Sequence, residues 1–252
     1  MFDGVYLYRM REIVEIIIAS GLVCLASMLF VTSFTSMGLF TFGEPLFFIS
    51  CLLLGPYSSA FIGGVGFSLA SFLLGYPHYM LASLMIKSAA GFVVSTLSKR
   101  IKNRFVDITS SLILAILFGL VGAFKFSGEI YFGYTTAFFL GERVLEHNGL
   151  WAQKVYLPDV AWFLMSLALI SAIILSEYKG VSGNKWFGAS LLSGCILIVL
   201  SYLLYEVFIM PTVFNVTVDA ISNVSVNAGQ SILAATIAMV VGKLIRLSET
   251  IY

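Results

Sequence analysis

Long apolar stretches separated by short polar connections make up most of the chain. A helix needs about 20 apolar residues to cross a ~30 Å hydrocarbon core at ~1.5 Å per residue. The second stretch, 42–54, reaches only ~20 Å as a helix, so we expect it to be tilted or shielded by its neighbours. By this criterion the chain has eight predicted membrane segments, at about 12–34, 42–54, 57–75, 79–98, 108–126, 158–176, 186–208 and 226–246.

Composition supports a membrane protein. The chain is 60% hydrophobic and 11% charged, whereas a soluble domain is usually about 45–50% apolar and about 25% charged. The net charge of +1 argues against a nucleic-acid partner. We therefore predict an all-α, polytopic helical bundle in the lipid bilayer, forming a single integral membrane domain over residues 1–252.

The distribution of basic residues predicts the orientation. The connection Lys99–Arg104 holds the densest basic cluster, and cytoplasmic connections are enriched in Lys and Arg. Placing it inside puts both termini inside, with ten of the fourteen basic residues. The stretch Ile13–Val31 exceeds the core of a signal peptide, so we interpret it as the first membrane helix. We expect a multi-pass plasma-membrane protein with two cytoplasmic termini.

The longest polar connection, Ser127–Leu157, is then external. Its charged or titratable residues are Glu129, Glu142, Arg143, Glu146, His147 and Lys154. The aromatic stretch Ile130–Leu140 fits an interfacial helix lying among the headgroups. It fits a short hairpin that caps the bundle equally well, and the sequence does not choose.

Polar residues inside the segments gather in the predicted outer half. Lys87 lies about eight residues, or ~12 Å, into its segment. A charge in hydrocarbon costs roughly 2.5–3.5 kcal/mol, so such residues face protein or water. The inner half has almost no such residues, which is typical of a binding cavity open to the exterior. The outer set is Glu44, Lys87, Glu206, Asn223, Asn227 and Gln230.

Helical spacing places these residues on shared faces. Ser83, Lys87 and Gly91 lie at i, i+4 and i+8, and Gly91 leaves room for a ligand or a neighbouring backbone. Lys87 could instead be a structural partner of Glu206 or Glu44.

A second row joins Asn223, Asn227 and Gln230, whose amides both donate and accept hydrogen bonds. Such a row suits a flat heteroaromatic ring, although interhelical hydrogen bonding is the alternative. Tyr79 and Tyr205 lie near segment ends, as residues of an aromatic belt do. Tyr76 and Tyr79 flank the external turn before the fourth segment and could also cover a pocket.

Motifs for enzymatic chemistry are absent from the sequence. It has no GxxxxGK[ST] phosphate loop, no HExxH and no G-x-S-x-G. The three cysteines fit small core residues. We therefore predict no enzyme, no catalytic residue, no metal and no cofactor.

Several stretches together resemble the substrate-binding S component of energy-coupling factor (ECF) vitamin transporters, closest to the riboflavin and pyridoxine-type branch. They are Gly55-Pro56 with the glycine-rich 60–74, then 75–79, Met85–Gly91, Lys99-Arg100, Tyr202–Glu206 and 223–246. The resemblance implies capture of a vitamin from outside, with a transmembrane coupling subunit and two ATP-binding-cassette ATPases as partners. The predicted ligand contacts are Lys87, Glu206, Asn227 and Gln230, followed by Asn223, Tyr79 and Tyr205.

The chain departs from this family in two ways. Family members have a six-helix core, so the region at about 105–180, with two extra helices and the external loop, is predicted to be an insertion. The family's first helix often carries an A-x-x-x-A face for the coupling subunit, and the nearest equivalents here are Ala19, Ser20, Cys24 and Ala26. The alternative to a transporter subunit is a structural or assembly subunit without a small-molecule ligand.

Overall fold

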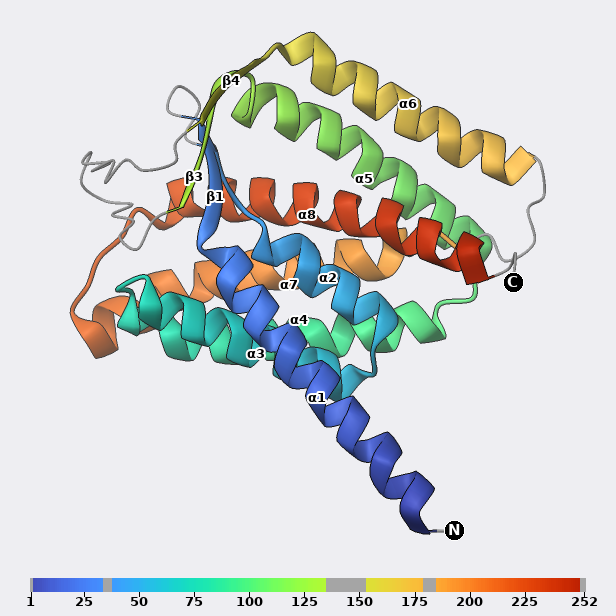
Figure 1. Ribbon diagram of the computed structural model, residues 1–252. Coiled ribbons are helices and arrows are strands. Elements are labelled where there is room, and N and C mark those ends of the chain that lie inside the picture. Colours follow the sequence, from blue (N-terminus) through green and yellow to red (C-terminus); the bar gives the residue numbers. More distant parts are fainter. Residues whose placement is uncertain (1, 34–37, 135–152, 179–184, 250–252) are drawn as a thin grey trace.

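A computed structural model describes residues 2–33, 38–134, 153–178 and 185–249, and these form a helical bundle with a small sheet at one end (Figure 1). Eight α-helices appear in the described ranges, close to the eight segments expected from the apolar runs. They are α1 Phe2–Ser27, α2 Gly43–Leu53, α3 Pro56–Leu73, α4 Pro77–Arg100, α5 Arg104–Lys125, α6 Asp159–Tyr178, α7 Gly188–Leu204 and α8 Ala220–Glu249.

Five helical stretches are long and apolar enough to cross a membrane: α4, α5, α6, α7 with its extension to Phe214, and Ala220–Ile245 of α8. The predicted polytopic helical bundle is thus confirmed. The orientation of the termini remains a prediction. The connection between α4 and α5 and the C-terminal end of α8 lie at the end of the bundle opposite the sheet (Figure 1).

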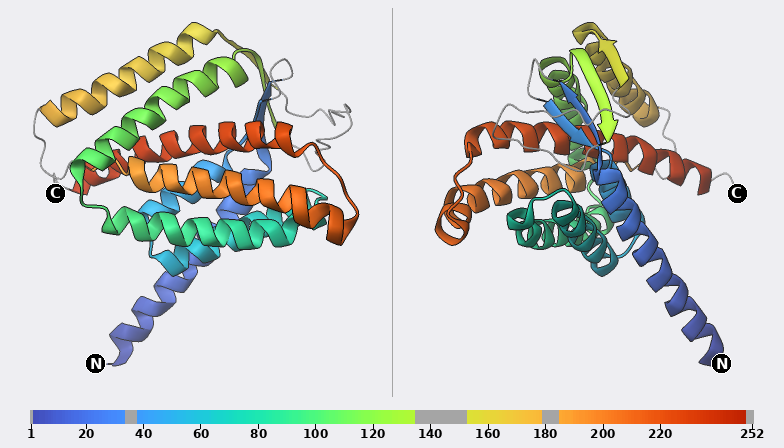
Figure 2. Two further views of the ribbon diagram at one scale, coloured as in Figure 1. Left: turned by 180° about the vertical axis from the view of Figure 1, so that it is seen from behind. Right: turned by 60° about the vertical axis from the view of Figure 1, so that its left-hand side comes forward.

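The helices stack in layers. Helices α3 and α4 form one side, α7 and α8 lie across the middle, and the pair α5 and α6 covers the other side (Figures 1 and 2). Helix α5 contacts α7 and α8 as well as α6. Helix α1 crosses the bundle obliquely, and its N-terminal part projects from it (Figure 2). The prediction that 105–180 is an insertion remains open, but α5 is packed into the bundle.

The sheet is the feature that the hydrophobic pattern missed. Four antiparallel strands lie in the order β2-β1-β3-β4, with β1 Leu29–Ser33, β2 Gly38–Thr41, β3 Gly128–Tyr134 and β4 Gln153–Leu157. The first helix was predicted to run to 34, but it ends at Ser27 because the next residues pair with β2 and β3.

The interfacial-helix interpretation of Ile130–Leu140 is wrong over 130–134, which is strand. The pairing of β3 with β4 agrees with the hairpin alternative. Residues 135–140 lie outside the described residues, as do Glu142, Arg143, Glu146 and His147 of the predicted external loop.

An exposed ion pair joins β3 to β4. Lys154 Nζ lies 2.5 Å from Glu129 Oε1, and the Tyr131 hydroxyl donates to Glu129 Oε2 at 2.8 Å. The hydrogen bonds from Lys154 and Tyr131 lower the pKa of Glu129. These charges therefore stabilise the pairing of two strands that belong to separate parts of the chain.

Close backbone approach holds α3 against α4. A Cβ added at Gly91 would lie 2.5 Å from the Ser59 carbonyl oxygen, and one at Gly64 would lie 2.9 Å from the Leu84 carbonyl oxygen. In lipid, helices associate through such contacts because the surrounding acyl chains are as apolar as leucine. Gly64 and Gly91 therefore serve the packing of α3 against α4, and the room beside Gly91 is taken by a neighbouring backbone, one of the two alternatives given for it.

Candidate functional site

A buried ion pair joins two of the predicted residues. Lys87 of α4 donates to Glu44 Oε1, the second residue of α2. The side chains are only 2% and 4% exposed. Gln230 of α8 also reaches Glu44 Oε1, with its Nε2 at 3.2 Å, and lies 3.4 Å from Thr41 Oγ1 of β2. Of the two carboxylates that the sequence offered as partners for Lys87, the structure selects Glu44.

Aromatic rings surround the ammonium group of Lys87. Its Nζ lies 4.4 Å from the ring centroid of Phe67 and 5.8 Å from that of Tyr202. Rings at these distances attract a cation through their quadrupole. Glu44 and these rings therefore surround the ammonium group with favourable partners at a depth where an isolated ammonium would be expensive.

Glu206 forms the second polar centre. It lies at the start of a π-helical segment, η1 Tyr205–Phe214, which continues α7 and contains Pro211. A π-helix has a wider turn than an α-helix, is rare, and is frequently found at functional sites. Tyr79 of α4 donates a hydrogen bond from its hydroxyl to Glu206 Oε1 at 2.9 Å.

Further contacts connect η1 to α4 and α8. The Tyr205 hydroxyl donates to the backbone carbonyl of His78, and Asn223 of α8 is a side-chain hydrogen-bond partner of Glu206. The rings of Tyr79 and Tyr205 lie 6.0 Å apart. Tyr79 therefore contacts the carboxylate directly, and Tyr205 packs against Tyr79.

The two centres lie on common helical rows. Tyr79 and Lys87 share one face of α4, and Asn223 and Gln230 share one face of α8. Asn227 lies between the two amides, half-buried, and it makes no hydrogen bond within the described part of the chain. The structure therefore brings Lys87, Gln230 and Glu44 together at one end, and Glu206, Tyr79 and Asn223 at the other.

Tyr202 links the centres, and sequence reasoning did not select it as a site residue. Its hydroxyl lies 3.0 Å from Ser83 Oγ, which in turn lies 3.1 Å from Ser71 Oγ. Tyr202 is 8% exposed and its ring lies 6.3 Å from that of Tyr79. The signal was available, because Ser83 lies on the face that carries Lys87 and because a buried tyrosine needs a hydrogen-bond partner.

Two carboxylate oxygens are buried without a partner. Glu44 Oε2 and Glu206 Oε2 accept no hydrogen bond in the described part of the chain, although both residues are 3% exposed. Leaving a buried acceptor unsatisfied costs about 1–3 kcal/mol, and more when it is charged. Both oxygens are thus unsatisfied acceptors inside the described bundle.

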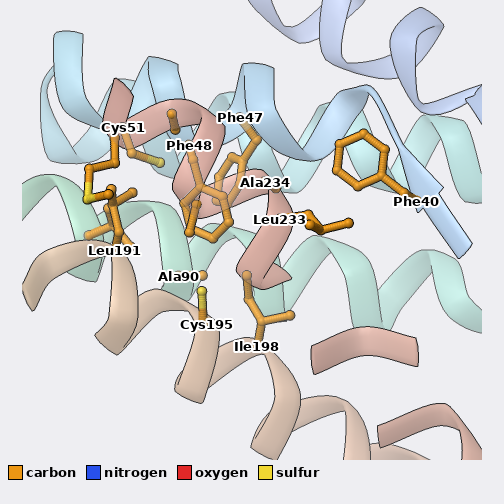
Figure 3. Packing of buried hydrophobic residues seen from close by; sticks show 14 of the residues in the cluster. Phe40, Phe47, Phe48, Cys51, Ala90, Leu191, Cys195, Ile198, Leu233 and Ala234 are labelled. Atoms are coloured by element: carbon orange, nitrogen blue, oxygen red, sulfur yellow. The ribbon is translucent and has the colours of Figure 1, made fainter. Parts of the chain in front are cut away.

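Apolar side chains close the bundle beside the ion pair. Phe47 and Phe48 of α2 meet Ala90 of α4, Ile198 of α7 and Leu233 of α8 in a core that excludes water (Figure 3). Each of these five residues is at most 4% exposed. The rows of polar side chains on α4 and α8 therefore end at a buried apolar cluster.

Two further charged residues are buried at the end of the bundle opposite the sheet, where the sequence led us to expect few polar groups. Asp107, at the start of α5, is buried and accepts hydrogen bonds from the backbone N–H groups of Trp186 and Phe187 at 2.8 and 3.2 Å. Lys243 of α8 is also buried, with its Nζ 5.0 Å from the ring of Trp186. Lys243 was counted as a cytoplasmic charge, but α8 continues past it to Glu249, so it lies inside the bundle.

The predicted docking residues on α1 divide between two environments. Ser20 and Cys24 are buried, and the Ser20 carbonyl faces Gly66 of α3. Ala19 and Ala26 are half-buried. The most exposed apolar side chains of this helix, such as Leu25, lie on other positions. Docking of a coupling subunit through α1 remains a prediction.

The chemistry of the site is that of binding. Charged, amide and hydroxyl groups alternate with aromatic rings, which suits recognition of a flat polar molecule. Within the ranges that the structure describes, no three His, Cys, Asp or Glu residues lie close enough to hold a metal ion.

Comparisons with known proteins give a consistent picture. Residues 8–146 match a protein family described as ECF-type riboflavin transporter, S component. The match covers more than half of the chain and runs into the region predicted to be an insertion.

A protein of Pyrococcus woesei, described as "Uncharacterized protein in gap 3'region", is 38% identical over 68 residues. These residues are 27% of this chain and 45% of that relative, so the chain spans less than half of it. No solved structure matches significantly.

Proposed function

This chain belongs to the family of S components of ECF-type riboflavin transporters, and on that premise we propose that it captures a vitamin or related flat heterocycle, with riboflavin the leading candidate, from outside the cell. The family is one of transporter components rather than enzymes. The ligand is held between α4 and α8, with contributions from Glu44 of α2 and Glu206 of η1.

The observation that carries this proposal is the double row of polar side chains at the sheet end of the bundle. Lys87 and Tyr79 supply one row, and Asn227 and Gln230 supply the other. Glu206 and Asn223 lie at the outermost end, where Tyr205 packs against Tyr79. The rows end at the buried apolar cluster around Phe47 and Phe48, and a solute that enters from the sheet end would stop at this cluster.

We further propose that uptake depends on a transmembrane coupling subunit and two ATP-binding-cassette ATPases, because the sequence has no phosphate-binding loop of its own. Both termini and the connection Lys99–Arg104 lie in the cytoplasm in this proposal. Basic residues in that connection give the orientation by the positive-inside rule.

An assembly subunit without a ligand is the competing function. It is favoured by the pairing of Lys87 with Glu44 and of Tyr79 with Glu206, since polar groups also hold membrane helices together. An assembly role does not explain why Glu44 Oε2 and Glu206 Oε2 are buried without a donor in the described part of the chain, or why the Asn227 amide has no hydrogen-bond partner there.

Asn227→Leu separates the two functions. It removes the amide midway along the α8 row, so we expect riboflavin affinity to fall at least about tenfold, as loss of a buried hydrogen bond implies. Quenching of flavin fluorescence by the purified protein measures this affinity. Ser171→Leu, at an exposed position of α6, is the control and leaves the affinity unchanged. Equal affinity in Asn227→Leu and the wild type would remove Asn227 from the site.

A further inference from the structure

The connection between α4 and α5 carries a cluster of positive charge at the end of the bundle opposite the sheet (Figure 1). Lys99 and Arg100 are the last two residues of α4, and Lys102 lies two residues before α5 begins at Arg104. All three residues of the cluster are exposed. We call Lys99, Arg100 and Lys102 the basic connection.

The neighbouring carboxylates leave this charge uncompensated. Glu177, near the end of α6, is bound by Arg104, whose Nη2 lies 2.5 Å from Glu177 Oε2. Asp107 of α5 is buried and accepts from two backbone N–H groups that precede α7. Lys99 Nζ donates to the neutral backbone carbonyl of Leu54 at 3.1 Å. Among the residues that the structure describes, no carboxylate forms an ion pair with the basic connection.

The exposed face of α5 indicates where these charges lie in the bilayer. Large exposed apolar residues follow one face of this helix, at Phe105, Ile113, Ile116, Leu120 and Phe124. The row from Phe105 to Phe124 is ~28 Å long at ~1.5 Å per residue, which matches a hydrocarbon core of ~30 Å. Because the basic connection immediately precedes this row, it lies at the level of the lipid headgroups of one leaflet.

Exposed aromatic residues at the same end agree with this level. Phe105 is 77% exposed, and Tyr178, the last residue of α6, is 89% exposed. Tyr178 follows Glu177, which Arg104 binds, so it lies close to the start of α5. Aromatic residues are enriched where a membrane protein crosses the headgroup region. The basic connection therefore faces headgroups, whose phosphates are the complementary anions.

We propose that the basic connection binds the headgroup of an anionic phospholipid, whose acyl chains lie along the exposed face of α5. Clusters of Lys and Arg beside a membrane helix attract anionic lipids, and an arginine can donate two parallel hydrogen bonds to a phosphate. A zwitterionic lipid offers the same phosphate, but its ammonium group is repelled by the cluster. The anionic lipid is therefore expected to be preferred at least about tenfold. This binding does not depend on the vitamin site.

Native mass spectrometry of the purified full-length protein measures the preference. The protein is released from mixed micelles with equal amounts of phosphatidylglycerol and phosphatidylcholine that have identical acyl chains, and the ratio of the two lipids in the singly lipid-bound protein is the readout. Arg100→Gln/Lys102→Gln removes two exposed charges and keeps the pair of Arg104 with Glu177, so the ratio should fall at least about fivefold. Lys125→Gln/Lys154→Gln removes the same charge near the sheet end, and this matched control leaves the ratio unchanged.

The remaining outcomes identify what the cluster binds. Equal retention of the two lipids would overturn the proposal and would favour an acidic protein surface instead. The proposal also fails if Arg100→Gln/Lys102→Gln, shown to be folded by size-exclusion chromatography, keeps the ratio of the wild type. Inorganic phosphate added at constant ionic strength should leave phosphatidylglycerol bound, and displacement would indicate a site for free phosphate. Lipid enrichment without riboflavin binding would contradict the proposed function alone.

Discussion

Replacing Lys87 by methionine tests the buried ion pair most severely. The substitution keeps an unbranched side chain of similar length but leaves Glu44 as a charge that is 3% exposed. Removing one partner of a buried pair costs about 3–5 kcal/mol. The lost attraction of the ammonium to Phe67 is worth about 0.5–2 kcal/mol, and a methionine sulfur near that ring recovers about 0.3–1.5 kcal/mol.

The hydrogen bond from Gln230 to Glu44 remains in the variant and limits the damage. We therefore expect Lys87→Met to lower the free energy of unfolding by about 3 kcal/mol, the lower end of the range for such pairs. This corresponds to roughly a 100-fold change in the ratio of folded to unfolded protein.

The double variant Lys87→Met/Glu44→Gln provides the control. It replaces the pair by neutral groups of similar volume, which is often close to neutral for stability. We expect it to unfold within about 1 kcal/mol of the wild type, so that the coupling between the two positions is about 2 kcal/mol or more. The assay is chemical unfolding in mixed micelles, followed by circular dichroism.

Stability and binding then give separate answers. Purely additive effects of the two substitutions would refute the buried pair as the structure shows it. A double variant that is as stable as the wild type but binds riboflavin at least about tenfold more weakly assigns the pair to the ligand. Unchanged affinity in that variant would make Lys87 a structural partner of Glu44, the alternative that the sequence left open.

Three further substitutions follow from the structure. Asp107→Ala removes the acceptor of two backbone N–H groups before α7, so the free energy of unfolding in micelles should fall by about 2–3 kcal/mol without a change in riboflavin affinity; an unaltered unfolding curve would contradict the role given to Asp107. Tyr79→Phe removes the hydroxyl donor to Glu206 and should cost about 1–3 kcal/mol by the same assay, and full stability would mean that water replaces the hydroxyl. The lowered pKa of Glu129 means that its ion pair stabilises the fold above the ordinary carboxyl pKa of about 4.3 and that this contribution is lost as the pH falls through the lowered value; Lys154→Met should raise that pKa in an NMR titration, and an unmoved pKa would show that the pair does not form in solution.

The helices were predictable because the bilayer imposes a length on each apolar run. Residues 29–33 show the limit of this criterion. They continue the apolar run of α1, so their hydropathy fits a helix, yet they form β1 because β2 and β3 lie beside them. The partners are distant in sequence, and strand pairing of this kind leaves no local signal.

The position of a residue along its helix was more predictable than the neighbour that its side chain faces. Helical spacing placed Lys87 at the level of the site, but it did not show that Glu44 rather than Glu206 faces it. The i, i+4 spacing of Ser20 and Cys24 likewise gave a shared face, although which neighbour covers that face is decided by the packing of α1 on α3. Rotation of each helix about its axis depends on all of its neighbours, and a single sequence does not contain it.

The central claim is that the polar rows between α4 and α8 hold a solute. Analysis of the small molecules that the protein carries when it is purified from its native membrane, by absorbance and mass spectrometry after denaturation, tests this most directly. The account predicts about one flavin or similar heterocyclic vitamin per chain. Protein that carries no such molecule, and whose melting temperature no vitamin raises, would contradict it.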